Sequence, residues 1–171
     1  MDEITYVRFN AERDFGRVRD LFDRAGDYVR LETGKEPGDE YVRECLSGAP
    51  PQIGPDGYHN YGLERPDGTL AGFAGSIQGY YAPKDWYMGL LVLDPAERGK
   101  GLGTAAFAFI RERAEALGAP VIRIAVLDAN KAGRRFWERQ GFTLERTVPG
   151  DPEGDGHMRH VRRLELDGGA P

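Results

Sequence analysis

The amino-acid sequence predicts an α/β (α+β) domain in which helices lie on the faces of one mixed β-sheet. Segments with the apolar pattern of strands are interspersed with segments whose apolar residues recur at helical spacing. Their order along the chain is βααβββαβαββ, which is typical of a layered domain built on one sheet. The 171 residues, of which 40% are apolar and 30% charged, suffice for one such domain with a sizeable core.

The first part of the chain is predicted to contain one strand and two helical regions. Apolar and polar residues alternate over residues 4–9, as they do in a half-buried strand. Residues 11–31 carry apolar side chains at helical spacing, which predicts one helix or a bent pair. A second short helix is predicted over residues 39–46, with Asp39 as its N-cap. Residues 47–57 are rich in Gly and Pro and predict a loop.

The middle of the chain has the pattern of a hairpin followed by an apolar strand. Residues 58–64 and 69–81 are predicted strands. The Arg-Pro-Asp-Gly sequence of residues 65–68 predicts a tight turn between them. Residues 86–93 are apolar almost throughout, which is consistent with a strand buried on both faces.

The following segment is predicted to alternate between helix and strand. A helix over residues 102–117 precedes a strand over residues 121–127. The next helix has two N-cap candidates, Asp128 and Asn130, and ends at Gly141, where a helix commonly stops.

A hairpin is predicted to close the domain. It pairs residues 142–148 with residues 158–166 across an acidic loop, so we expect a single domain over residues 1–166. Residues 167–171 are expected to be a frayed tail.

Composition limits the class of partner. The formal net charge of −5 argues against a nucleic-acid-binding protein, whose footprint is normally basic. No apolar run approaches the length of a membrane span, and the first residues lack a signal-peptide pattern. The single cysteine, Cys45, excludes an internal disulfide and suits a reducing compartment, so we expect a cytoplasmic protein.

A glycine-rich loop, Arg98-Gly99-Lys100-Gly101-Leu102-Gly103, connects an apolar strand to a helix. It lacks the Lys-Ser/Thr ending of a P-loop, and Thr104 stands where a dinucleotide-binding fingerprint would have its third glycine. Backbone N–H groups at such a helix start can converge on an anion, and Arg98 and Lys100 are cationic donors for a phosphate. An ordinary strand-to-helix turn explains the glycines about equally well.

Two motifs in this order resemble the GNAT superfamily of acyl-CoA-dependent N-acetyltransferases. The first is Arg98-x-x-Gly101-x-Gly103, preceded by the apolar strand and Asp94-Pro95. The second, some 30 residues later, is Asn130 followed by Phe136-Trp137-x-x-x-Gly141-Phe142. The clear match covers about residues 86–142. The resemblance implies a mixed, mostly antiparallel sheet of six to seven strands, with helices on both faces. It also implies that the parallel strands 86–93 and 121–127 splay apart.

The resemblance further implies that acetyl-CoA lies between these two strands. The pantetheine arm would pair with main-chain groups of Leu91, Val92 and Leu93. The pyrophosphate would rest on the glycine loop. Asn130 would hold the pantetheine region, although an N-cap role explains it too and both roles can coexist. The remaining cofactor-binding residues implied are Arg98, Gly99, Lys100, Gly101, Leu102, Gly103, Thr104 and Trp137.

The chemistry that the resemblance implies makes few demands on side chains. The backbone amide of Leu91 would face the thioester oxygen, where negative charge develops. Trp137 stands where many relatives carry a tyrosine that protonates the thiolate. An indole cannot do so, and packing is the favoured role for Trp137. For the proton acceptor the candidates are Tyr87, Asp85 and a water chain, because the strand positions where relatives place a glutamate carry Tyr87 and Ala125 here.

The function expected from the sequence is acetyl transfer from acetyl-CoA directly to a small-molecule or peptide amine. The alternative is a non-catalytic acyl-CoA-binding or sensing module, suggested by the missing tyrosine. Cys45 lies outside both motifs, so a covalent acyl-enzyme is not expected. The C-terminal hairpin is a possible homodimer contact.

Other polar residues have a simpler interpretation as surface or packing groups. His157 and His160 are three residues apart on a predicted strand and so point to opposite faces, which disfavours a shared metal, and no metal is expected. His59 is expected to pack or to be exposed. Two further groups are expected on solvated helix faces. They are the acidic Asp23, Asp27, Glu32 and Glu36, and the basic Arg134, Arg135 and Arg139, one of which could meet the 3′-phosphate of the coenzyme.

Overall fold

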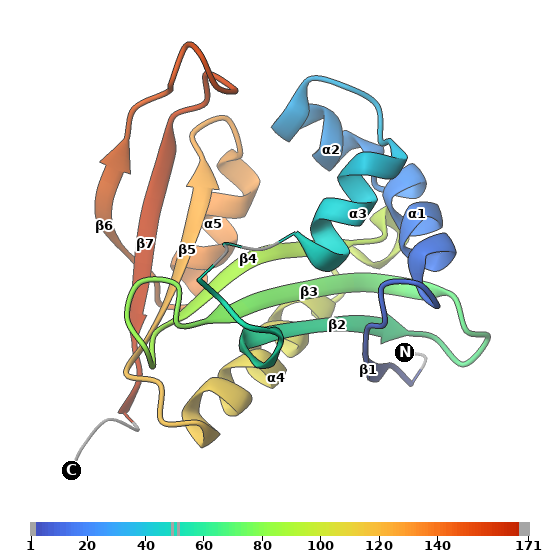
Figure 1. Ribbon diagram of the computed structural model, residues 1–171, viewed down its shortest axis with the longest axis horizontal. Helices are drawn as coiled ribbons and strands as arrows, with labels where there is room; N and C mark the ends of the chain where they lie inside the picture. Colours follow the sequence, from blue (N-terminus) through green and yellow to red (C-terminus); the bar gives the residue numbers. More distant parts are fainter. Residues whose placement is uncertain (1–2, 49, 51, 168–171) are drawn as a thin grey trace.

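The computed structural model describes residues 3–48, 50 and 52–167, and one seven-stranded sheet runs through it in the order β1-β2-β3-β4-β5-β7-β6 (Figure 1). Neighbouring strands are antiparallel except for the parallel pair β4–β5, so the predicted mixed, mostly antiparallel sheet is confirmed. The strands are β1 (Thr5–Arg8), β2 (Tyr58–Glu64), β3 (Leu70–Gln78), β4 (Trp86–Leu93), β5 (Val121–Leu127), β6 (Thr143–Val148) and β7 (Arg159–Glu165).

Helices cover both faces of the sheet, as predicted. The α-helices are α1 (Phe15–Arg24), α2 (Gly26–Thr33), α3 (Asp39–Ser47), α4 (Leu102–Ala116) and α5 (Lys131–Arg139), and short 3₁₀ turns occur at Pro55–Gly57 and Pro95–Glu97. Helices α1, α2 and α3 pack on one face, around the fully buried Phe22 and Phe73. Helices α4 and α5 pack on the other face, around Trp86, Ile110 and Trp137. None of the helices in the described ranges is both long and apolar enough to cross a bilayer.

Strands β4 and β5 diverge soon after they meet. The pairing between these two strands consists of Trp86 with Ile122 and Tyr87 with Arg123. Among the described residues no further pair joins β4 to β5. At the same point the register between β3 and β4 shifts, because Ser76 pairs with Met88 whereas Gly75 pairs with Leu90. The extra residue is Gly89, and such a bulge bends the strand that carries it. The sheet therefore opens between β4 and β5, as expected for a splayed pair.

The bulge also changes which side chains of β4 face each core. Before it, Trp86 and Met88 belong to the core under α4 and α5. After it, Leu90 and Val92 pack against α1, α2 and α3, whereas Leu91 packs on the opposite side. The prediction that this strand is buried on both faces was wrong, because Leu90 and Leu91 are only partly buried where the strands separate.

Several predicted element ends differ from the structure. The helical region 11–31 is a bent pair, since α1 and α2 meet at Ala25. Gly38, not Asp39, is the N-cap of α3, and the Asp39 carboxylate instead accepts a hydrogen bond from Arg19. Strand β3 ends at Gln78, three residues earlier than expected. Of the tail predicted to fray, residues 168–171 lie outside the described residues.

The N-cap of α5 is Asn130 rather than Asp128. The side-chain oxygen of Asn130 accepts a hydrogen bond from the N–H of Gly133 at 2.9 Å. Asp128 instead accepts from His160 Nε2 at 2.8 Å, across from β7. His160 is therefore tied into a contact between elements, and not a free surface histidine as expected.

A buried carboxylate joins the start of α1 to the strands beside it. The side chain of Asp14 is 1% exposed and accepts hydrogen bonds from Arg13, from Arg17 and from the N–H of Asn10. Arg17 in turn contacts Glu64 at the end of β2. Burial raises the pKa of Asp14, but these hydrogen bonds outweigh burial and lower the pKa to about 2.

We predict that this carboxylate stabilises the fold at neutral pH and loses its effect in acid. Its folded pKa lies below the ordinary value of 3.8, so its contribution is complete above pH 4 and is lost as pH falls towards 2. Asp14→Ala should lower the free energy of unfolding at pH 7 by roughly 2 kcal/mol, and by much less at pH 2.5, in urea denaturation. Asp23→Ala is the control, since Asp23 is 53% exposed and pairs only with Arg19 on its own helix. Equal losses at both pH values would contradict the assignment.

Candidate functional site

A pocket of about 620 Å³ occupies the opening between β4 and β5. Its walls are the diverging strands, α2 on one side and the starts of α4 and α5 on the other. The residues predicted to bind a cofactor that line it are Leu91, Val92, Leu93, Arg98, Gly99, Gly101, Gly103, Thr104, Asn130 and Trp137. The structure thus gathers ten of the predicted residues around one cavity.

Two predicted cofactor-binding side chains do not line this pocket. Leu102 is 4% exposed and packs into the core under α4. The side chain of Lys100 is 59% exposed, and its Nζ lies 3.9 Å from Glu97 Oε2. These positions can contribute main-chain N–H groups to the loop, whereas their side chains point elsewhere.

The strand edges inside the pocket offer backbone groups for hydrogen bonding. Beyond Tyr87 on β4 and Arg123 on β5, neither strand pairs with the other. The N–H and C=O groups that face the gap therefore have no ladder partner, like those of an edge strand. An extended, amide-bearing ligand placed there would complete the missing ladder.

The glycine loop closes one end of the pocket with open space above its main chain. Gly99 and Gly101 have φ angles of +75° and +88°, a left-handed conformation that other residues adopt only with strain. A Cβ atom added to either would meet no atom within 4 Å, so nothing fills the space over the backbone. Gly103 serves packing instead, since a Cβ there would lie 3.2 Å from the ring of Phe136.

Helix α4 begins directly after this loop and presents unpaired amides. Its first intrahelical hydrogen bond runs from the N–H of Ala105 to the carbonyl of Gly101, so the N–H groups of the preceding turn have no helical partner. Together with the positive end of the helix dipole, they form an anion-binding concavity.

Arg98, predicted as a phosphate donor, is held across the pocket by a residue from α2. Its Nη1 and Nη2 donate to the two carboxylate oxygens of Asp27 at 2.5 and 3.0 Å. The hydrogen bonds from Arg98 lower the pKa of Asp27 despite its partial burial. Asp27 is therefore part of the pocket wall and not simply a solvated helix residue as expected. Its guanidinium partner stands where an anionic ligand would meet the glycine loop.

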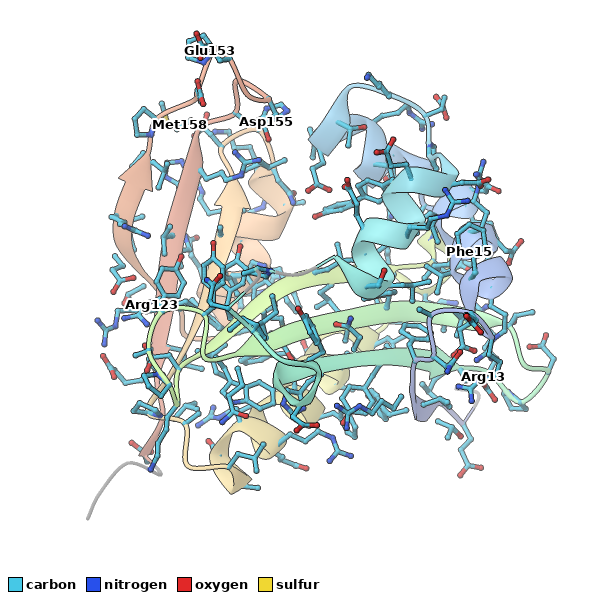
Figure 2. The ribbon with its side chains drawn as sticks, viewed as in Figure 1. Arg13, Phe15, Arg123, Glu153, Asp155 and Met158 are labelled. Atoms are coloured by element: carbon cyan, nitrogen blue, oxygen red, sulfur yellow. The ribbon has the colours of Figure 1, made fainter. Side chains whose placement is uncertain are left out.

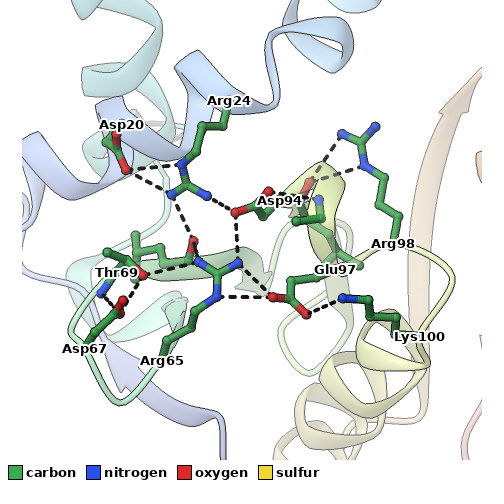
Figure 3. Close-up of polar contacts among 12 residues, drawn as sticks. Asp20, Arg24, Arg65, Asp67, Thr69, Asp94, Glu97, Arg98 and Lys100 are labelled. Carbon is green, nitrogen blue, oxygen red and sulfur yellow. Dashed lines mark hydrogen bonds and ion pairs between the residues drawn. The ribbon is translucent and has the colours of Figure 1, made fainter. Parts of the chain in front are cut away.

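A network of charges fixes the turn before the glycine loop (Figure 3). Asp94 caps the 3₁₀ turn by accepting from the N–H of Ala96, and it also pairs with Arg24 of α1 and Arg65 of the β2–β3 turn. Arg65 reaches Glu97 at 2.9 Å as well. Two segments distant in sequence, α1 and the β2–β3 turn, thereby hold the turn that leads into the glycine loop.

Asn130 and Trp137 combine structural roles with positions on the pocket wall. Asn130 caps α5 while lining the pocket, so its N-cap role does not exclude contact with a ligand. The ring of Trp137 meets those of Phe107 and Phe142 edge-on, at 5.5 and 5.2 Å between centroids. Packing, the role favoured for Trp137, is what these contacts show.

The predicted proton acceptors lie outside the pocket wall. Tyr87 stacks on Tyr80 at 5.1 Å, and burial raises the pKa of Tyr87 to about 12, so its phenol is neutral at ordinary pH. Asp85 is held by Arg123 at 2.5 Å. Ala125 lines the pocket without a titratable group. Among the described residues that line it, Asp27 is the one carboxylate.

Sequence reasoning named Asp27 among the acidic residues of the N-terminal helices but did not single out its neighbours on α2. Tyr28 and Leu31 line the pocket beside Asp27, and only the helical spacing of α2 could have hinted at this. Arg139 also lines it, whereas Arg134 and Arg135 do not. His59 packs on Trp86 with ring centroids 4.4 Å apart, as expected of a buried histidine.

Comparison with known proteins finds acetyltransferases. Residues 19–142 match the model of the acetyltransferase (GNAT) family. A GNAT-family protein from Desulfovibrio desulfuricans has a TM-score of 0.76 and 20% identity, over 95% of this chain and 99% of that one. An acetyltransferase from Thermus thermophilus has a TM-score of 0.73 and 20% identity, over 97% of this chain and 100% of that one. The ribosomal-protein-S18-alanine N-acetyltransferase of Escherichia coli has a TM-score of 0.70 and 16% identity, over 96% of this chain and 94% of that one. No curated protein matches the sequence significantly.

The raised pKa of Tyr87 predicts that the folded protein loses stability at high pH. The folded state favours the neutral phenol, so the contribution is complete below pH 10 and is lost as pH rises from 10 towards 12. Urea denaturation of wild type and Tyr87→Phe should differ by a constant amount between pH 7 and 9. Above pH 10 the difference should fall by on the order of 2 kcal/mol. If the difference in unfolding free energy between wild type and Tyr87→Phe stays constant to pH 11.5, the raised pKa of Tyr87 is contradicted.

Proposed function

Because the chain belongs to the GNAT acetyltransferase family, we propose that it transfers an acetyl group from acetyl-CoA directly to an amine. The observation that carries this proposal is the pocket between β4 and β5, which ends at an open glycine loop. An amide-bearing arm needs unpaired strand edges, and a pyrophosphate needs amides at a helix start. This one cavity offers both.

The residues fit the coenzyme from one end to the other. The pyrophosphate would accept hydrogen bonds from main-chain N–H groups between Gly99 and Thr104, where the space above the loop is open. Arg139, on the pocket wall at the end of α5, is the arginine placed to meet a further phosphate. The pantetheine arm would pair with main-chain groups of Leu91 to Leu93.

When bound, acetyl-CoA supplies an acetyl group activated as a thioester with a thiolate leaving group. The N–H of Leu91 would donate to the thioester oxygen and stabilise the charge that develops there. An acceptor that arrives as an ammonium group first loses a proton to water, because only the neutral nitrogen has a lone pair. The nitrogen then bonds to the carbonyl carbon, the carbon–sulfur bond breaks with its electrons on sulfur, and the nitrogen loses a second proton to water. A thiolate of conjugate pKa roughly 8.5 needs little help from an acid.

Positioning supplies most of the catalysis in this proposal. Trp137 cannot donate a proton, Tyr87 is a neutral phenol outside the pocket wall, and Asp85 is engaged by Arg123. Alignment of an amine with a thioester can account for many orders of magnitude in rate without a side-chain acid. A water chain to solvent is then the proton acceptor.

A second candidate function is acyl-CoA binding without catalysis. The observation that favours it is that Trp137 cannot donate a proton, while the one carboxylate among the described pocket-lining residues, Asp27, is engaged by Arg98. The two are separated by thiol release in the presence of acceptor amines, because a sensing module binds acetyl-CoA and releases no thiol.

We predict that Gly101→Glu abolishes the binding of acetyl-CoA. The new carboxylate would occupy the open space over the loop and repel a pyrophosphate. Isothermal titration calorimetry should show saturable binding to wild type and at least roughly a 10-fold loss, 1.4 kcal/mol, in the variant. Gly68→Glu is the matched control. Gly68 has a φ of +85° with nothing within 4 Å of its Cβ position, but it lies in the β2–β3 turn. Unchanged binding by Gly101→Glu would exclude the proposed pyrophosphate site.

We also predict that Asp27→Asn strengthens the binding of coenzyme A. In wild type a pyrophosphate must compete with Asp27 for Arg98, whereas the amide variant leaves that guanidinium free. A partly exposed ion pair contributes about 0–1 kcal/mol, so affinity should rise two- to five-fold at low salt. The control is Asp23→Asn, which removes a similarly exposed charge that does not line the pocket. A weaker affinity in Asp27→Asn would show that Asp27 supports the site.

A further inference from the structure

A cluster of polar side chains faces the splayed strands from the side of α2 and α3. Tyr28 and Glu32 lie one turn apart on α2, and Tyr28 lines the pocket. Tyr41 of α3 donates a hydrogen bond from its hydroxyl to Glu32 at 2.5 Å. None of these groups is among the residues that the proposed function assigns to the coenzyme, so they are available to the second substrate.

Arg159, the first residue of β7, belongs to the same cluster. It pairs with Leu127 in the β5–β7 ladder, and Val161 pairs with Ala125, so these side chains share one face of the sheet. Tyr87 pairs with Arg123 of β5, which puts its ring on that face too. Ala125 and Leu127 line the pocket, so Arg159 lies beside a pocket residue through its pairing with Leu127.

The charges of Glu32 and Arg159 act on the same two tyrosines. Burial and then the Glu32 carboxylate raise the pKa of Tyr28, and Arg159 opposes them. Burial is also the main cause of the raised pKa of Tyr87, on which Glu32 and Arg159 again act in opposite directions. Tyr28 and Leu31, which flank Glu32 on α2, line the same pocket as Leu127, the ladder partner of Arg159, so this carboxylate and this guanidinium each lie next to residues of one pocket.

Arg159 already holds a carboxylate in this structure. Its guanidinium bonds Asp155, from the acidic β6–β7 connection, and donates to the carbonyl of His157 at 3.3 Å. Figure 2 shows Asp155 on the side of this connection that faces α2, with Glu153 at its tip. Both partners of the Arg159–Asp155 pair are about one third exposed. A carboxylate of similar geometry can therefore replace that of Asp155, since a guanidinium fork binds such groups bidentately.

We propose that the acceptor is a small amino acid, whose carboxylate binds Arg159 and whose ammonium group is received by Glu32. This inference rests on the acetyl transfer proposed above. The Glu32 carboxylate supplies the charge opposite to that of the ammonium group. The two charges of an amino acid thus match the two charges of the cluster. A peptide N-terminus or a simple alkylamine lacks the carboxylate that Arg159 would bind.

The experiment compares matched acceptors by coenzyme A thiol release. The probes are the common amino acids, their carboxamides, their decarboxylated amines and a short peptide carrying the same first residue. At least one amino acid should exceed its carboxamide and its decarboxylated amine about 100-fold in kcat/KM. Comparable turnover of the peptide or of the uncharged partners would overturn the inference. So would the absence of turnover with every amino acid.

Two variants with opposite expected effects on KM distinguish recognition of the acceptor by Arg159 from a purely structural role of the Arg159–Asp155 pair. Arg159→Gln should raise KM for the amino acid at least about 10-fold and leave the carboxamide unaffected. Asp155→Asn frees the guanidinium and should lower KM about three-fold. Loss of activity in both variants would overturn the inference, because it would mean that the ion pair only holds the hairpin. Arg163→Gln is the control, since Arg163 lies on the same strand with a side chain 34% exposed, against 33% for Arg159.

Direct binding distinguishes failure of this inference from failure of the proposed function. Calorimetry should show the amino acid binding to protein saturated with coenzyme A, weakened at least about 10-fold by Arg159→Gln. Acetyl-CoA affinity should stay within two-fold in all three variants, because these side chains do not line the coenzyme pocket. Normal acetyl-CoA binding without preference for carboxylates would overturn only the acceptor class. No binding of acetyl-CoA to wild type would overturn both.

Discussion

The separation of β4 from β5 is the constraint on which the rest of this structure depends. Two residue pairs hold the strands together at one end, and the bulge at Gly89 turns β4 away from its neighbour beyond them. Backbone groups inside a sheet are normally satisfied by the adjacent strand. Here they face a cavity. After Gly89, side chains of β4 still contact both hydrophobic cores, although Leu90 and Leu91 are only partly buried.

Charged side chains fix the position of the loop that ends this cavity. Asp94 ties the glycine loop to α1 and to the β2–β3 turn, while Arg98 ties it to α2. Isolated surface pairs contribute little stability, but several pairs that share one carboxylate restrict where a loop can lie. An anion-binding loop depends on such restriction, because its amides bind a phosphate best when they already point towards it.

The distribution of titratable groups suits a reaction governed by alignment. Burial keeps the phenol of Tyr87 neutral, and Arg123 engages Asp85, so neither group is available to take a proton in the pocket. Aromatic side chains form part of the wall of the opening. Trp137 packs among Phe107, Phe136 and Phe142 on the α5 side, and Tyr28 lines the pocket from α2.

The sequence by itself determined the fold class, the order of the elements and the glycine loop, because these follow from local periodicity and from residues with special backbone freedom. The tertiary structure decided what the loop's neighbours do. Asp27 and Asp128 had the local pattern of an exposed helix residue and of an N-cap, yet the chain brings Arg98 to one and His160 to the other. The pairing of Arg159 with Leu127, across from α2, likewise depends on strands far apart in sequence. Contacts of this kind arise from packing between distant segments, and no local pattern records them.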